Sequence, residues 1–115
     1  MLARINRLTG QKNFSRLKKE GRRKSFDLFN VSYVDRKDND PSRFGFIVTN
    51  KTARLATDRS RVKRALREPI RTSMSEIKKG MDILYIAKSL SLKKSTSEIM
   101  IEVAKSIEVL GITKR

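Results

Sequence analysis

Histidine and cysteine are both absent from the 115 residues, and so is tryptophan. Without cysteine there can be no disulfide framework and no thiolate zinc site. Without histidine the chain lacks the commonest general base, the commonest metal ligand and any Ser-His or Cys-His nucleophile pair. These absences remove the usual protein groups for acid–base and nucleophilic catalysis.

Long hydrophobic runs are missing as well. No stretch approaches the roughly 18 consecutive apolar residues of a membrane span, and residues 1–7 lack the apolar core of a signal peptide. We therefore expect a soluble, cytoplasmic protein. With 115 residues, of which 37% are hydrophobic, the chain is expected to form a single domain over residues 1–115 with one modest core.

Positive charge is abundant, with 28 basic residues against 12 acidic ones and a net charge of +16. Such an excess points to a polyanionic partner, either nucleic acid or an anionic membrane surface. The excess is concentrated in residues 1–24, at +8, and in residues 51–71, at +6, whereas residues 25–50 carry −1. The pattern predicts two basic surfaces supported by one core.

The second basic block has the periodicity of a helix with two unlike faces. We expect it to run from Ala53 to about Ser73, capped by Thr52 and with Leu55 extending its apolar stripe. A kink or an early end is expected at Pro69, since proline in a helix interior costs roughly 3 kcal/mol. The predicted inner stripe is Val62, Ala65, Leu66, Pro69 and Ile70, and the opposite arc carries Arg61, Lys63, Arg64, Arg67 and Arg71, with Glu68 as its one acid. A grid of fixed cations of this kind suits a phosphate backbone.

The remaining elements are predicted from hydrophobic periodicity and from turn and cap residues. We expect an α+β fold in which helices pack on a small sheet. Residues 22–24 are expected to form a basic turn, and residues 25–28 are an uncertain short strand. The predicted elements are a helix over Gln11–Lys19 that stops at Gly21, alternating strands over Phe29–Val34 and Arg43–Thr49, a buried strand over Asp82–Ala87, and a helix opened by the capping box Ser95–Glu98 and ended by Gly111.

Acidic residues offer little for metal binding. Asp38 and Asp40 are the nearest approach to a paired-carboxylate site, but a turn whose side chains cap its own backbone is the favoured interpretation. Gly45, in the second alternating strand, predicts either a bulge or the close approach of another group.

The run from Arg59 to Arg64, followed by Arg67 and Glu68, resembles the arginine-rich signature of the bacterial ribonuclease P protein subunit. The resemblance extends over almost the whole chain and is specific in its order and spacing. The other matching positions are Asn6-Arg7-Leu8, Phe14, Gly21, Phe29, Arg43, Gly45, Lys51 and the segment from Asp82 to Lys88.

This resemblance implies a specific fold and function. The family fold is an α-β-β-β-α-β-α sandwich with a four-stranded sheet, similar to domain 2 of ribosomal protein S5, and a left-handed crossover. The family protein is the partner of a catalytic RNA that removes the 5′ leader from precursor tRNA. That RNA carries out the hydrolysis with Mg²⁺, which it holds together with the substrate, and the protein is expected to be monomeric without RNA and to bind no metal tightly.

The resemblance also assigns roles to residues, none of them catalytic. The positions expected to meet the catalytic RNA are Lys51, Arg54, Arg59, Ser60, Arg61, Lys63, Arg64, Arg67 and Arg71. The cleft for the single-stranded leader would be lined by Phe14, Lys18, Asn30 and Ser32.

The chain departs from the family pattern at three places. The middle asparagine of the motif is Ser60, positions 18 and 32 are Lys and Ser where aromatic residues are common, and Ile70 replaces an aromatic residue after the unusual Pro69. Because base stacking contributes roughly 1–3 kcal/mol per base, leader binding here is expected to depend more on charge than on stacking.

Two alternatives remain open. One is a general RNA-binding or ribosome-associated module with no enzymatic role. The other, a membrane-surface or architectural DNA protein, is disfavoured because tryptophan is absent and the apolar stripe is needed for the core. The RNA hypothesis would fail if residues 59–67 were buried or neutralised by nearby carboxylates.

Overall fold

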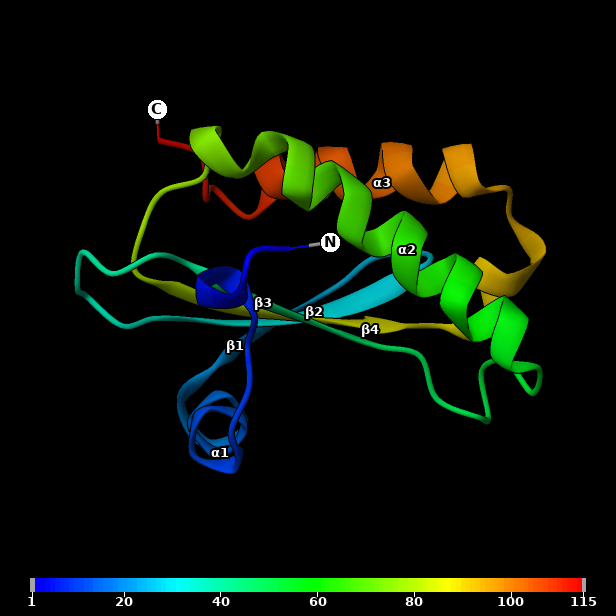
Figure 1. Ribbon diagram of the computed structural model, residues 1–115, viewed down its shortest axis with the longest axis horizontal. Coiled ribbons are helices and arrows are strands. Elements are labelled where there is room, and N and C mark those ends of the chain that lie inside the picture. Colours follow the sequence, from blue (N-terminus) through cyan, green and yellow to red (C-terminus); the bar gives the residue numbers. More distant parts are fainter. Residues whose placement is uncertain (1, 115) are drawn as a thin grey trace.

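The computed structural model describes residues 2–114 and has the predicted α-β-β-β-α-β-α order (Figure 1). Short 3-10 turns lie at Arg4–Asn6 (η1), Met74–Glu76 (η2) and Ser89–Lys93 (η3). The helices and strands are α1 (Gln11–Glu20), β1 (Arg22–Ser25), β2 (Phe29–Asp35), β3 (Arg43–Ile47), α2 (Ala56–Ser73), β4 (Met81–Ala87) and α3 (Thr96–Val109).

The four strands form one mixed sheet in the order β1-β2-β4-β3. The pairs β1–β2 and β2–β4 are antiparallel, whereas β3 and β4 are parallel. A parallel pair requires a crossover connection, and α2 supplies it. The α+β class and the four-stranded sheet are thus confirmed, while the left hand of the crossover stays a prediction.

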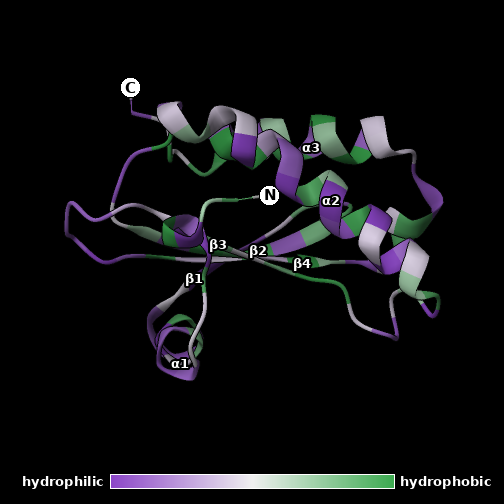
Figure 2. Ribbon diagram, in the orientation of Figure 1, coloured by the Kyte–Doolittle hydropathy of each residue, from purple (hydrophilic) through white to green (hydrophobic). Residues whose placement is uncertain are grey.

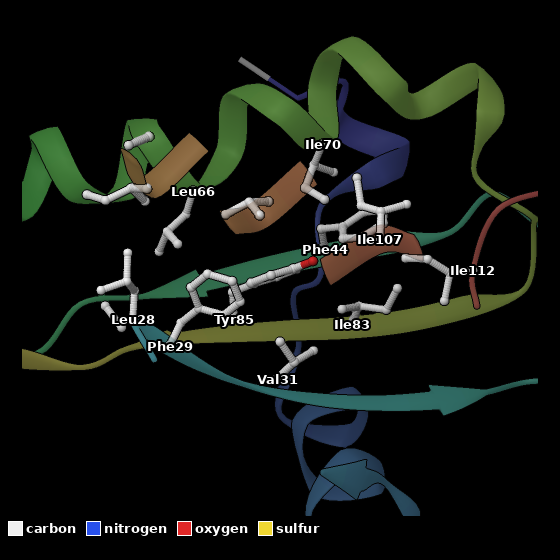
Figure 3. Close-up of a cluster of buried hydrophobic side chains, with 14 of the residues drawn as sticks. Leu28, Phe29, Val31, Phe44, Leu66, Ile70, Ile83, Tyr85, Ile107 and Ile112 are labelled. Carbon is white, nitrogen blue, oxygen red and sulfur yellow. The ribbon is translucent and has the colours of Figure 1, made fainter. Parts of the chain in front are cut away.

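The two faces of the sheet are covered differently. Helices α2 and α3 lie side by side over one face, and α1 lies alone on the opposite face (Figure 1). Strand side chains alternate between the faces, so Phe29 and Val31 of β2 and Tyr85 of β4 point toward α2 and α3 (Figure 3). Tyr85 is fully buried, and its hydroxyl group lies 2.8 Å from Ser106 Oγ. Burial raises the pKa of Tyr85 to about 12, despite the opposing effect of that hydrogen bond.

A smaller apolar cluster lies under the other face, between α1 and the sheet. It consists of Leu8, Leu17 and Leu84, with Phe14 packed against it. Gly45 makes this close packing possible, since a Cβ atom there would lie 3.0 Å from Leu84 Cδ1 and 3.5 Å from the side chain of Leu8. Of the two roles predicted for this glycine, close approach of another group is the one found.

The start of α2 differs from the prediction. The helix begins at Ala56 and not at Ala53, Thr52 is not its cap, and Leu55 is exposed and does not extend the stripe. The reason is local. Thr52 belongs to a turn in which its backbone N–H and that of Ala53 donate to Thr49 O, at 3.1 and 3.0 Å, and the two threonine hydroxyls lie 3.2 Å apart.

The predicted end of α2 at about Ser73 is confirmed, so of the two effects expected at Pro69, a kink or an early end, the early end is not found. Pro69 and Ile70 are both buried, and Ile70 belongs to the main core. Burial of these two side chains favours the helical path and offsets the hydrogen bond that proline cannot make. A kink at Pro69 stays a prediction.

Two strand predictions need correction as well. Residues 22–24, expected as a turn, belong to β1, and of the uncertain strand at residues 25–28 only Ser25 is in a strand, again β1. Residues 26–28 form a turn in which Phe26 N donates to Phe29 O at 2.9 Å. All four residues of β1 are exposed, so this edge strand is held by pairing with β2 and has no apolar alternation to reveal it. Strand β3 ends at Ile47, two residues before the predicted limit.

The predicted features of α1, β4 and α3 are confirmed. Helix α1 starts at Gln11, and β4 is covered on both faces. The capping box that opens α3 is present, with Ser95 Oγ accepting from Glu98 N at 3.1 Å and Glu98 Oε1 accepting from Ser95 N at 3.2 Å.

Candidate nucleic-acid interface

Helix α2 carries its positive charge on the side that faces away from the sheet. Its buried residues are the predicted stripe, Val62, Ala65, Leu66, Pro69 and Ile70. Burial of that stripe fixes the rotation of the helix and turns the intervening basic residues toward solvent. Figure 2 shows the resulting alternation of hydrophilic and hydrophobic residues along α2.

Lys63 and Arg64 are the least restrained cations of this helix. Both side chains are exposed, and neither makes a hydrogen bond or an ion pair within residues 2–114. Lys51 and Arg54, in the segment that leads into α2, are exposed as well. These four side chains are therefore free to bind an external anion.

Arg59 and Arg61 are half-buried and bind backbone carbonyl groups. Arg59 donates to Ala53 O at 3.0 Å and to Arg54 O at 2.8 Å, which holds the segment before α2 against the helix. Arg61 donates to Leu92 O at 3.1 Å and to Lys94 O at 3.2 Å. These partners are neutral carbonyl groups, so they do not compensate the positive charge of either arginine.

The end of α2 is electrostatically different from its start. Arg71 forms an ion pair with Glu68, with Nη2 and Oε2 2.8 Å apart, and this interaction lowers the pKa of Glu68 and raises that of Arg71. Arg67 is half-buried, and its Nε is buried without a hydrogen-bond partner. Of the nine predicted RNA-binding positions, Arg71 is thus the one whose charge is matched by a carboxylate.

A hollow of about 450 Å³ lies where the first turns of α2 and α3 meet. Helix N-termini attract anions, because their first N–H groups lack intrahelical partners and the helix dipole is positive there. Hydroxyl and guanidinium groups border the same space, which is lined by Ala56, Thr57, Ser60, Arg61, Arg64 and Thr96. Phosphate is the group that this combination of donors suits best.

The predicted conditions for an RNA-binding surface are met on α2. Within the described part of the chain, no carboxylate forms an ion pair with a basic residue of the segment 59–67. Lys63 and Arg64 are exposed, and Arg59, Arg61 and Arg67 are only partly buried. The basic grid therefore has an accessible surface and an uncompensated charge.

The four residues of the predicted leader cleft share the other face of the sheet. Phe14 and Lys18 lie one turn apart on α1, and Phe14 packs on the small apolar cluster. Asn30 and Ser32 lie on β2 opposite Ile86 and Leu84, which belong to the same face. Lys18 and Asn30 are exposed, whereas Ser32 is buried. The structure thus places the four residues on one face of the sheet, where little of Ser32 is accessible, and their role as a leader cleft stays a prediction.

A second group of cations was not singled out as a site from the sequence. The carboxylate of Asp82, fully buried in β4, accepts hydrogen bonds from Arg36 and from Arg43, the latter at 2.8 Å from both Nε and Nη2. Arg16 Nη1 of α1 lies 3.8 Å from the same carboxylate. One sequence signal existed: a lone acid in a fully buried strand requires a positive partner.

The favoured interpretation of the acidic turn is borne out by its hydrogen bonds. Asp38 Oδ1 accepts from the backbone N–H of Asp40 at 3.1 Å, and its carboxylate also binds Arg36. Within residues 2–114, no group of three or more acidic side chains could hold a metal ion. No helix in this range is long and apolar enough to cross a membrane.

Comparison with known proteins identifies the family. Residues 2–111 match the family model for Ribonuclease P. The chain belongs to that family. A Ribonuclease P protein component from Clostridioides difficile is 36% identical over 111 residues, which cover 92% of this chain and 91% of the relative. One from Alkaliphilus oremlandii is 32% identical over 95 residues, with coverages of 83% and 82%.

Solved structures of Ribonuclease P proteins share the fold. The protein from Staphylococcus aureus superposes with a TM-score of 0.84 at 26% identity, covering 93% of this chain and 96% of that one. The protein from Thermotoga maritima gives a TM-score of 0.77 at 25% identity, with coverages of 90% and 96%. The family resemblance seen in the arginine-rich run is therefore confirmed, and nothing in these matches supports a general ribosome-associated module.

Proposed function

We propose that this chain is the protein subunit of a cytoplasmic ribonuclease P, monomeric until it meets its RNA. In this proposal it binds the catalytic RNA and the 5′ leader of precursor tRNA, and thereby assists removal of the leader. The observation that carries the proposal is the unpaired charge of Lys63 and of Arg64, the latter lining the hollow between α2 and α3, within a chain of this family.

In this proposal the catalytic RNA binds on the α2 side of the sheet and the 5′ leader binds on the α1 side. Helix α2 offers its cations to the phosphates of the catalytic RNA, with Arg59 and Arg61 also shaping the surface through their hydrogen bonds to carbonyl groups. On the opposite face, Phe14 and Lys18 offer one apolar ring and one cation to the single-stranded leader. A leader held on one face leaves the other face free for the catalytic RNA.

We assign the hydrolysis to the RNA. The chain has no histidine or cysteine, and within residues 2–114 its acidic side chains do not form a group suited to Mg²⁺. Mg²⁺ prefers oxygen ligands and is commonly held through phosphates, which the RNA and the substrate supply. The role of the protein residues is to bind and orient the two RNA molecules.

Reconstitution tests this division. The protein is combined with the ribonuclease P RNA of Clostridioides difficile and a precursor tRNA at low Mg²⁺ concentration. Cleavage at one defined 5′ site is expected with both components and little with either alone. Cleavage by the protein alone, in nuclease-free preparations, would contradict the assignment of the chemistry to RNA.

Replacement of Phe14 and Lys18 tests the leader cleft. Phe14→Ala with Lys18→Ala should weaken binding of precursor tRNA roughly tenfold or more, because stacking on one base alone contributes roughly 1–3 kcal/mol. Binding of mature tRNA should change little, and Lys12→Ala, an exposed lysine on the same helix, serves as the control. Equal losses of affinity for precursor and mature tRNA would show that the leader does not bind on this face.

A further inference from the structure

A second cationic hollow, separate from the one on α2, lies on the α1 side of the sheet where β3 and β4 begin. Its volume is about 510 Å³, and the residues that matter here are Arg4, Arg7, Asn13, Arg16, Arg36 and Arg43. Helix α2 starts beyond the other end of β3 and lies on the opposite face (Figure 1). The two cationic hollows are therefore at opposite ends of the sheet.

The buried carboxylate of Asp82 holds this second hollow in shape. Arg36, with only 7% of its side chain exposed, donates to Asp82, to Asp38 and to the carbonyl groups of Met81, Asp40 and Pro41. Every nitrogen of its guanidinium group is thereby occupied. Arg36 therefore has a structural role. Arg36 and Arg43, which both bind Asp82, form one side of the hollow, which we call the arginine wall.

Charge in the hollow is not balanced. Leaving Arg7 aside, four arginines line it, against Asp38 and Asp40 in the lining and Asp82 behind it, which leaves one positive charge in excess. Asp38 already accepts a hydrogen bond from Arg36, which lowers the pKa of Asp38. An excess of positive charge in a concave site favours the binding of an anion.

Several guanidinium donors remain available to such an anion. Arg43 uses Nε and Nη2 for Asp82, with Nη2 also 3.2 Å from Asn13 Oδ1, and its side chain is 27% exposed. Arg16 is 34% exposed, and its one approach to Asp82, at 3.8 Å, is too long for a hydrogen bond. Arg4 is exposed and makes no side-chain hydrogen bond within residues 2–114. These three side chains come from η1, α1 and β3.

We propose that this hollow is a phosphate-binding site in which Arg4, Arg16 and Arg43 donate to one phosphate group. Guanidinium groups match phosphate oxygens in geometry and bind them in pairs, which favours phosphate over a spherical anion such as chloride. The phosphate can belong to an RNA backbone or be free in solution. Only the first source rests on the proposed function, because binding of free phosphate requires no RNA.

Titration of the whole protein with inorganic phosphate tests the site, at constant ionic strength maintained with chloride. The readout is the NMR signals of the arginine Nε–H groups in the unsubstituted protein, so the result does not depend on how variants fold. Saturable shifts confined to a few arginine signals are expected. Removal of one charge-assisted hydrogen bond should weaken the binding roughly tenfold in Arg16→Gln and again in Arg4→Gln, whereas Lys12→Gln, the matched removal of a cation on α1, should leave it unchanged.

Competition with RNA identifies the source of the phosphate, and comparison with chloride and with Lys12→Gln can contradict the site. If a short single-stranded RNA shifts the same arginine signals and competes with phosphate, the site takes backbone phosphate; if only inorganic phosphate does so, the site takes free phosphate. Both outcomes support the site. Equal shifts with phosphate and chloride, or equal weakening in Arg16→Gln and Lys12→Gln, would overturn it. Neither result bears on the proposed function, which the reconstituted cleavage assay tests separately.

Discussion

Two groups of basic residues in this molecule contrast in their partners and not in their charge. Around Asp82, Arg36 and Arg43 are tied to a buried carboxylate and line a rigid wall. On α2, Lys63 and Arg64 have no partner within residues 2–114 and face solvent. Charge in one group serves folding first, and charge in the other is available for RNA.

The comparison shows why a count of basic residues is a weak guide to a binding surface. The net charge of +16 implies a polyanionic partner, but it does not say which cations meet it. Arg71 illustrates the point, since it lies on the same arc of α2 as Arg64 and yet is paired with Glu68. The presence or absence of an acidic partner is what separates the two groups.

The largest effect is expected from breaking the first group. Asp82→Asn removes the carboxylate but keeps the size of the side chain, and it leaves Arg36 without its buried counter-charge. Removal of one partner of a buried ion pair costs about 3–5 kcal/mol. Urea unfolding should therefore show a free energy of unfolding lower by that amount.

Asp40→Asn is the matched control for this substitution. Asp40 lies in the turn between β2 and β3, next to Arg36, and is exposed, and its carboxylate makes no hydrogen bond or ion pair within residues 2–114. Its replacement should change the free energy of unfolding by no more than about 0.5 kcal/mol. Similar losses of stability in the two variants would mean that Asp82 is not the anchor of the arginine wall.

The second prediction concerns the unpaired group. Lys63→Gln with Arg64→Gln should leave the free energy of unfolding within about 0.5 kcal/mol of its original value, because neither side chain has a partner to lose. Binding to the catalytic RNA should weaken, and the slope of log K against log salt should fall by roughly 0.7–0.9 for each RNA phosphate that is no longer neutralised. Titrations at several salt concentrations measure the slope, and an unchanged slope would mean that α2 does not meet phosphate.

The same contrast explains which parts of the structure could be predicted from the sequence. The inner stripe of α2, the buried strand β4 and the capping box of α3 depend on residues close together in the chain, so periodicity and spacing were enough to find them. Local patterns also gave the order helix, strands, helix, strand, helix, to which the family resemblance added a third strand before α2. Local patterns failed for β1, whose four exposed residues are held by their partner strand.

The arginine wall could not be predicted for a related reason. Asp82 is 46 residues from Arg36 and 39 from Arg43, so these residues meet only because β4 pairs with both β2 and β3. The start of α2 was missed because the hydroxyl of Thr52 serves a turn with Thr49, an alternative that its position in the sequence does not reveal. Which cation is paired is therefore a property of the fold.

The smallest effect is expected from a substitution that frees Arg71 from its acidic partner. Glu68→Gln removes the carboxylate that Arg71 binds through Nε, at 2.9 Å, and Nη2, at 2.8 Å. Arg71 should then behave as Arg64 does: RNA should bind more tightly, with a salt slope steeper by roughly 0.7–0.9. Arg71→Gln should have the opposite but weaker effect, and no gain in the slope for Glu68→Gln would show that Arg71 lies outside the RNA surface.

Acidification provides an independent route to the same state. The hydrogen bond from Arg71 lowers the pKa of Glu68, so the pair contributes stability above the usual pKa of a glutamate and loses it as the pH falls through the lowered value. Protonation in that range frees Arg71, and the RNA affinity of the unsubstituted protein should then approach that of Glu68→Gln measured at the same pH. The difference between the two proteins should therefore be present at pH 7 and shrink toward zero on the acid side, which separates release of Arg71 from any general effect of pH on RNA binding.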